Sequence, residues 1–328
     1  LESIKTSNYG QGVQISDIKN CMKLYTLAYK YSNQISDNLK YTDIDLENYY
    51  NSNKTNFATY DYRSYNFSYA ADNAQALTKS DAKAYADKLY ACNKDSAYTA
   101  WLNSYLKASG KYADKAAIKK EIDSALTKDA MYTADDTFSE WAFTEGRKVG
   151  ETYLLDDTEN SCYTVYIMVA VPDKDTSNTI NVRHILLTTE TYGSDDDTLA
   201  AAQAVYDEWK SGDKTEDSFA ALAKTKSEDT GSASNGGLYE GVYEGQMVDT
   251  FNNWCFDSSR KTGDTGIVAT SYGYHIMYFV GINGEKWKSD VKDALQKDGY
   301  DKIYADYEAT YTVKLNNKNL SEINIIQK

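Results

Sequence analysis

The feature that most constrains the fold of this chain is an internal repeat. Residues 136–152 (DTFSEWAFTEGRKVGET) and 249–265 (DTFNNWCFDSSRKTGDT) align without gaps at an offset of 113 residues, with nine of seventeen positions identical. The identical positions include aromatic, basic and glycine pairs, namely Phe138/Phe251, Trp141/Trp254, Arg147/Arg260 and Gly150/Gly263. Each copy then continues into an apolar segment typical of a strand, at 162–171 or 274–282. The chain therefore contains two copies of one domain.

The two copies also begin alike, since each opens with a predicted strand in which Arg63 corresponds to Arg183. Between the copies, Pro172 and the polar residues 173–179 predict a linker, because proline, aspartate and serine favour turns over continued strands. The predicted boundaries are 58–171 for the first copy and 179–283 for the second.

Strands and helices alternate along the second copy. A strand is predicted at 181–188. A helix follows, with an apolar stripe made by Leu199, Ala202, Val205 and Trp209. The remaining elements are, in order, a short helix near 219–223, a glycine-rich bend at 231–237, a helix with Phe251 and Trp254, and two closing strands. This order predicts the α+β class, with a small antiparallel-rich sheet covered by helices in each copy.

Both chain ends are predicted to be helical. The helices expected at 14–31 and 286–297 each carry a single apolar face, which is too little for an independent core. The simplest arrangement packs residues 1–57 with 284–328 in one helical domain, so that the two copies form an insertion between the chain ends. Two independent helical appendages remain the alternative.

Charge and hydropathy exclude several classes of protein. Acidic residues outnumber basic ones by 49 to 35, and the net charge of −14 argues against a nucleic-acid or anionic-membrane partner. Mean hydropathy is −0.65, and no apolar run approaches the roughly 18–20 residues of a membrane span. Because the sequence opens at Leu1 without an apolar leader, we expect any targeting signal to have been trimmed.

The cysteines give no metal or redox motif. Four are spread at wide intervals without a C-x-x-C pair: Cys21, Cys92, Cys162 and Cys255. This spacing excludes a thiol-redox motif and a zinc site built from cysteines. Buried or half-buried free thiols are the simplest interpretation, and the pattern leaves their pairing open.

Histidine is the informative residue type. The chain has two histidines, His184 and His275, on the opening and closing strands of the second copy. A single histidine on a strand is usually structural, but two on adjacent strands could hydrogen-bond to each other. No third ligand is spaced to form a metal site, so neither a metal nor a cofactor is expected.

At the level of motifs, the second copy resembles the parvulin-type peptidyl-prolyl isomerases over its whole length. The matching segments are VRHIL (182–186), SFAALAKTKSED (218–229), NGGL (235–238), EGQMVDTF (244–251), the Phe256–Arg260–Gly263 segment and SYGYHIMYFV (271–280). The flanking helical regions resemble those of extracytoplasmic foldases of that family, which would make them a chaperone-like region.

The resemblance implies a site without a nucleophile, because rotation about an X–Pro bond needs only a proline pocket and a polar environment for the twisted amide. The catalytic residues it implies are His184, Asp229 and His275. The substrate-binding residues it implies are Leu238, Met247, Phe251 and Tyr272. Taken singly, each also has an ordinary structural interpretation, such as core packing or a solvated loop.

The first copy lacks this chemistry. Ser64 and Thr164 correspond to the two histidines, and Ala134 corresponds to Met247. Phe138 is retained, but the glycine-rich bend is absent. The first copy is therefore predicted to be a degenerate parvulin-like domain, inactive as an isomerase.

Together these features predict an extracytoplasmic foldase, secreted or anchored outside the cell membrane, that isomerises X–Pro bonds and acts as a chaperone. Its expected partners are unfolded or newly secreted polypeptides, with no nucleic acid and no membrane contact except through a trimmed anchor. Apolar rows around Tyr25, Tyr29 and Trp287 would line a cradle for unfolded segments. The alternatives are a non-enzymatic holdase and a tyrosine-rich adhesion module.

Overall fold

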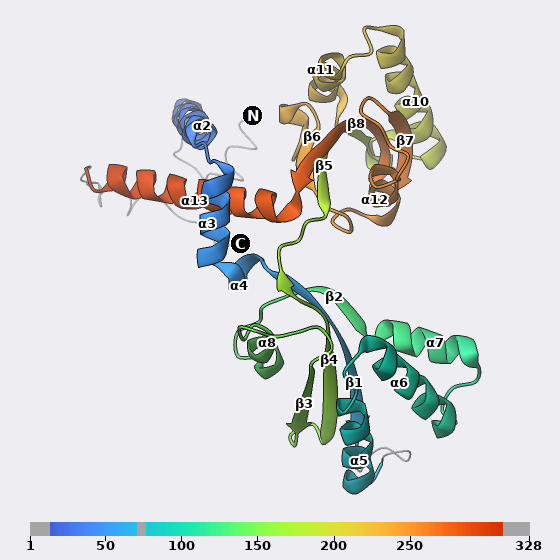
Figure 1. Cartoon of the computed structure of the whole chain (residues 1–328). Coiled ribbons are helices and arrows are strands. Elements are labelled where there is room, and N and C mark those ends of the chain that lie inside the picture. Colours follow the sequence, from blue (N-terminus) through green and yellow to red (C-terminus); the bar gives the residue numbers. More distant parts are fainter. Residues whose placement is uncertain (1–13, 71–76, 311–328) are drawn as a thin grey trace. The chain divides into compact units, whose positions relative to one another are not determined.

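A computed structural model describes residues 14–70 and 77–310 of the chain (Figure 1). It divides into two compact units. One is built from the two chain ends, up to Asn51 and from Asp290 onward. The other comprises Ser52–Ser289 and contains two sheets.

In the first unit, helices from opposite ends of the chain contact each other. The helices are α2 (Ile15–Asn38), α3 (Asp43–Ser52) and most of α13 (Lys286–Glu308). The hydroxyl of Tyr41 donates to the Leu295 carbonyl over 2.6 Å, and the hydroxyl of Tyr49 donates to the Asp298 carboxylate over 2.7 Å. These bonds join segments about 250 positions apart in the sequence.

The predicted cradle must be corrected at Trp287. Tyr25 and Tyr29 are 73% and 58% exposed, as a binding surface would require, but Trp287 is only 4% exposed. Its indole N–H donates to Glu285, and the Lys174 ammonium lies 4.4 Å from its ring centroid. Trp287 is therefore part of the second unit's packing, because the helix face that carries it is covered where α13 begins.

The two sheets of the second unit have the same topology, which confirms the duplication. The first contains β1 (Thr59–Ser68), β2 (Leu126–Met131), β3 (Thr152–Asp157) and β4 (Cys162–Asp173), in the order β2-β1-β4-β3. The second contains β5 (Asn178–Leu187), β6 (Leu238–Val242), β7 (Thr265–Thr270) and β8 (Gly273–Glu285), in the order β6-β5-β8-β7. All neighbouring strands are antiparallel.

Helices cover both faces of each sheet. In the first copy, α5 (Lys79–Tyr90), α6 (Asp95–Ser109) and α7 (Lys115–Ser124) pack on one face and α8 (Thr137–Ala142) packs on the other (Figure 1). In the second copy, α10 (Asp195–Ser211) and α11 (Glu216–Lys226) pack on one face and α12 (Asp249–Cys255) packs on the other. The second copy also contains α9 (Thr189–Tyr192) and the 3₁₀ turn η1 (Ala233–Asn235), and a short α4 (Lys54–Phe57) precedes β1.

The residues that the repeat conserves hold the same scaffold in both copies. The Nε of Arg147 donates to the Trp141 carbonyl over 3.0 Å, and its guanidinium lies 4.4 Å from that ring. Arg260 and Trp254 repeat these contacts at 2.9 and 4.0 Å. The opening arginines are paired as well, Arg63 with Asp95 in α6 and Arg183 with Glu216 in α11.

The predicted linker must be corrected at Pro172, which lies inside β4. Proline cannot donate a hydrogen bond to a neighbouring strand, and it is therefore tolerated in a sheet at bulges. The pairing of β1 with β4 shifts register between Thr59, which faces Asp173, and Asp61, which faces Ala170. Pro172 falls in this bulge, and the residues between the two sheets are only 174–177.

The structure also bears on the remaining composition arguments. All four cysteines lie in the described part of the chain and are free thiols. Among residues 14–70 and 77–310, no helix is long and apolar enough to cross a membrane. Within those same ranges, no three His, Cys, Asp or Glu side chains are grouped as a metal ion would require.

Candidate active site

The two histidines meet on the face of the second sheet that α12 covers. Antiparallel pairing sets His184 of β5 opposite Met277 and His275 of β8 opposite Leu186. They are diagonal neighbours on adjacent strands, where side chains of one face approach each other. Their Nδ1 atoms are 2.9 Å apart, and the side chains are almost fully buried.

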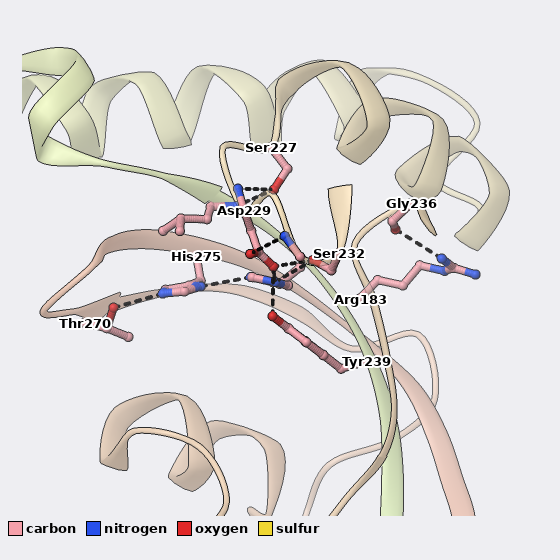
Figure 2. Close-up of polar contacts among 11 residues, drawn as sticks. Arg183, Ser227, Asp229, Ser232, Gly236, Tyr239, Thr270 and His275 are labelled. Atoms are coloured by element: carbon pink, nitrogen blue, oxygen red, sulfur yellow. Dashed lines mark hydrogen bonds and ion pairs between the residues drawn. The ribbon is translucent and has the colours of Figure 1, made fainter. Parts of the chain in front are cut away.

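A chain of hydrogen bonds runs through both rings. Beyond His275, its Nε2 is 2.9 Å from the Thr270 hydroxyl. Beyond His184, its Nε2 is 2.9 Å from Asp229 Oδ2. Figure 2 shows this chain running from Thr270 through His275 toward Asp229. We call Thr270, His275, His184 and Asp229 the polar floor.

Asp229 sets the direction of the hydrogen bonds. An ionised carboxylate only accepts, so Nε2 of His184 carries its hydrogen and Nδ1 of the neutral ring accepts. His275 therefore donates through Nδ1–H, and its Nε2 accepts from the hydroxyl of Thr270. Every donor in the polar floor thus points toward Asp229.

The ionised state of Asp229 is strongly favoured. The hydrogen bond with His184 is the largest cause that holds the pKa of Asp229 well below its usual range. The carboxylate also accepts from Ser232 Oγ at 2.5 Å, from the Tyr239 hydroxyl at 2.9 Å and from the Gly231 N–H at 3.1 Å. These donors outweigh the desolvation that acts in the opposite direction.

His275 is kept neutral by its surroundings. Burial, followed by the neighbouring His184 ring, lowers the pKa of His275 to about 4. A neutral ring is also what the hydrogen-bond directions require, because His275 must accept from Thr270 through Nε2.

A cavity of about 340 Å³ opens over the polar floor. Its lining consists of His184, Leu186, Asp229, Tyr239, Gln246, Met247, Val248, Phe251, Tyr272 and His275. Phe251 of α12 stands nearly perpendicular to both imidazoles, with ring centroids 5.6 and 5.4 Å away. We call Met247 and Phe251 the apolar wall. The cavity thus joins an apolar surface to a fixed polar one.

Six of the seven site residues predicted from the sequence lie at this cavity, and Leu238 does not. In β6, Leu238 is paired with Arg183 and Tyr239 with Val182. Successive side chains of a strand point to opposite faces, so Tyr239, not Leu238, shares the cavity face with Val182. Tyr272 is at the rim, 61% exposed, with its N–H donating to the Thr270 hydroxyl.

The sequence does not indicate three hydrogen-bonding residues of the site, Ser232, Tyr239 and Thr270. The place of Tyr239 at the cavity depends on the pairing register of β6 with β5. Ser232 lies in the glycine-rich bend and Thr270 at the end of β7, and neither position carries a pattern that distinguishes it from an ordinary turn residue.

The equivalent face of the first copy is filled by aromatic rings. Ser64 faces Tyr166 and Asn66 faces Thr164 in the strand pairing, the register that His184 and His275 have in the second copy. Tyr166 stacks on Phe138 with ring centroids 3.9 Å apart. Phe138 therefore contacts another ring where Phe251 contacts the histidines.

Comparison with known proteins gives the class of this domain. Residues 165–280 match the family model of the PPIC-type PPIase domain. This match identifies the second copy as a parvulin-type domain.

The similar proteins include bacterial foldases. The chain is 38% identical to foldase protein PrsA 1 of Listeria innocua over 122 residues, 36% of this chain and 37% of that protein. It is 28% identical to foldase protein PrsA of Staphylococcus epidermidis over 225 residues, 61% and 67% of the two chains. It is 31% identical to the parvulin of Nitrosopumilus maritimus over 32% of this chain and 98% of that structure, with a TM-score of 0.25. The matches span between 30% and 37% of the length of the first curated relatives.

Proposed function

We propose that this protein is an extracytoplasmic folding factor whose second copy catalyses cis/trans isomerisation of X–Pro bonds. The observation that carries this proposal is the cavity in which the apolar wall stands over the polar floor. Isomerisation of an X–Pro bond requires a pocket for the proline ring, which Met247 and Phe251 would form. It also requires a fixed polar surface, which the hydrogen bonds that end at Asp229 would provide.

The physical problem is the barrier to rotation, roughly 18–20 kcal/mol, which comes from amide resonance. Rotation removes that resonance, so the lone pair localises on the amide nitrogen, which becomes able to accept a hydrogen bond. Groups that are already oriented stabilise such a state without reorganising. The polar floor is held in one arrangement by its own hydrogen bonds and is covered by Phe251, so its dipoles are fixed before substrate binds. No covalent intermediate is needed.

We propose unfolded or newly secreted polypeptides as the clients. The support comes from relatives that are named foldases and from α2, where large apolar side chains such as Tyr25 and Tyr29 are exposed. The net charge of −14 opposes nucleic-acid binding and would help to keep captured clients in solution. A location outside the cytoplasm, secreted or anchored, is part of the same proposal.

The duplication supplies a matched test of the enzymatic part. Phe251 and Phe138 occupy equivalent positions, and each is 3% exposed. Phe251→Leu and Phe138→Leu in the full chain should therefore disturb packing to a similar degree. Only Phe251→Leu should lower kcat/KM on an X–Pro peptide, by about tenfold, because part of the proline pocket is lost.

A protease-coupled or NMR exchange assay measures this. Equal losses in the two variants, or a wild-type chain without activity, would contradict the isomerase assignment. The second outcome would favour the alternative, a holdase that only binds peptides, which is tested separately by suppression of client aggregation.

A further inference from the structure

Tyr239 lies where the apolar wall and the polar floor meet. It is on β6, and its side chain lines the cavity beside Phe251. Its hydroxyl donates to Asp229 Oδ2 over 2.9 Å, a bond drawn in Figure 2. Its ring stacks on His184, with centroids 5.1 Å apart and an interplanar angle of 25°. One side chain therefore contacts the cavity, the carboxylate and the first imidazole.

The direction of the Tyr239–Asp229 bond is fixed near neutral pH. Burial and, after it, the hydrogen bond with Asp229 raise the pKa of Tyr239 to about 12, so its hydroxyl keeps the proton. Asp229 is ionised, and a hydrogen bond to an ionised acceptor is about twice as strong as one between neutral groups. Tyr239 is therefore a strong donor to the carboxylate that orients both histidines.

The other donors approach the same carboxylate from different segments. Ser232 Oγ and His184 Nε2 also reach Oδ2, while the Gly231 N–H reaches Oδ1. Ser232 and Gly231 belong to the same loop as Asp229. Tyr239 comes from β6, so its bond ties the loop to the sheet on which His184 lies.

We propose that Tyr239 is a positioning residue for isomerisation. Its hydroxyl holds the Asp229 carboxylate, and through it the His184 ring, in the arrangement that a bound peptide meets. A phenylalanine would form the same cavity surface and could stack on His184, but it would leave the carboxylate with one donor fewer. This inference rests on the isomerase function proposed above.

The test is Tyr239→Phe in the full chain, assayed for isomerisation over a range of pH. We expect kcat to fall about tenfold, the size typical of one lost hydrogen bond to a charged group, while KM stays unchanged. The acid limb of the rate profile should move to higher pH. With one donor fewer, Asp229 is protonated more easily, and its protonation removes the acceptor that orients His184.

The control is Tyr243→Phe, which changes a tyrosine on the connection that follows β6 and outside the cavity lining. Its kcat and its pH profile should match those of the unchanged chain. A second variant, Ser232→Ala, removes another donor from Asp229 and leaves the cavity surface of Tyr239 intact. It should shift the acid limb in the same direction, again without raising KM.

A readout that does not depend on activity separates this inference from the proposed function. The carboxyl ¹³C titration of Asp229 should move to higher pH in Tyr239→Phe and stay in place in Tyr243→Phe. That shift in a chain without isomerase activity would contradict the proposed function and support the positioning of Asp229. An active chain in which Tyr239→Phe raises KM, keeps its pH profile or leaves the titration unmoved would overturn the positioning role.

Discussion

At the scale of single residues, the second copy depends on a buried base that must stay neutral. His275 is 5% exposed, and its Nε2 accepts from Thr270 while its Nδ1 donates to His184. A second proton on His275 would turn the Thr270 hydroxyl away from the ring and leave its hydrogen only the Gly273 carbonyl, 3.4 Å away. It would also add a charge in a place from which water is excluded. The pH dependence of this domain follows from that requirement.

We expect the second sheet to lose stability as the pH falls from about 6.5 to about 4. In this window the unfolded chain protonates His275 and the folded chain does not, since the folded pKa is about 4. By linkage the loss is on the order of 3 kcal/mol. The contribution of Asp229, whose pKa is lowered from an ordinary value of 3.8, is lost only at still lower pH.

Hydrogen exchange of the β5 and β8 amides in the full chain, corrected for intrinsic rates, measures this loss. The first sheet has no histidine and serves as the internal control. His275→Asn should flatten the dependence between these two pH values. An equal decline in both sheets would show that His275 is not its cause.

Single residues also show what the sequence could and could not predict about the site. The meeting of His184 and His275 was predictable, because the chain has two histidines and both lie on strands that open and close one domain. Which of Leu238 and Tyr239 lines the cavity was not predictable. It depends on the face that β6 presents, which the pairing register with β5 sets and no local pattern indicates.

At the scale of elements, the glycine-rich bend is what brings Asp229 and β6 to the first histidine. Gly237 has φ +71°, and a Cβ there would lie 2.0 Å from the His184 carbonyl oxygen. The Gly237 carbonyl accepts from the His184 N–H over 2.8 Å. The backbone of Gly237 therefore packs directly on the backbone of His184, and only glycine leaves room for this contact.

Gly237→Ala should unfold or displace this bend, whereas Gly263→Ala, at φ +89° with nothing within 4 Å, isolates the cost of the positive φ. We expect about 1 kcal/mol for Gly263→Ala and about 1–3 kcal/mol more for Gly237→Ala, from overpacking. Isomerase activity should fall only in Gly237→Ala. Chemical shifts of His184 and Asp229 measure the displacement. Identical behaviour of the two variants would contradict the packing argument.

Elements also show where sequence patterns mislead. The strand at 162–171 and the helix around Phe251 were predicted from the sequence and are present as β4 and α12. The sequence predicts a linker that begins at Pro172, because proline lacks the N–H that a sheet uses. At a β-bulge one residue stays unpaired, so the missing N–H of Pro172 costs the sheet no hydrogen bond. A bulge cannot be recognised from the sequence of one strand.

At the scale of the whole molecule, the chain ends meet through a few hydrogen bonds. Tyr49 of α3 bonds to Asp298 of α13, and Tyr41, in the connection before α3, bonds to Leu295 of the same helix. That residues 1–57 and 284–328 form one domain stays a prediction. Trp287, inside the predicted boundary at 284, belongs to the second unit. The apolar face of a helix does not indicate which partner covers it.

Ending the chain after Ser289 should expose α3 and spare both sheets. We expect faster hydrogen exchange in α3, by at least about tenfold, because its partners on α13 are removed. A chain that ends after Thr310 keeps those partners and is the matched control. Isomerase activity should be nearly unchanged in both. If α3 stayed equally protected after the shorter truncation, a shared terminal domain would be wrong.

Pro172 has one more consequence, for how this protein itself matures. It is the single proline among the 328 residues, so only one X–Pro bond in them can delay folding by slow isomerisation. In an unfolded chain such a bond is cis in roughly 10–30% of molecules, so in most molecules it is already trans, as it is in the folded structure. Folding of these residues therefore depends little on the isomerase activity proposed for the second copy.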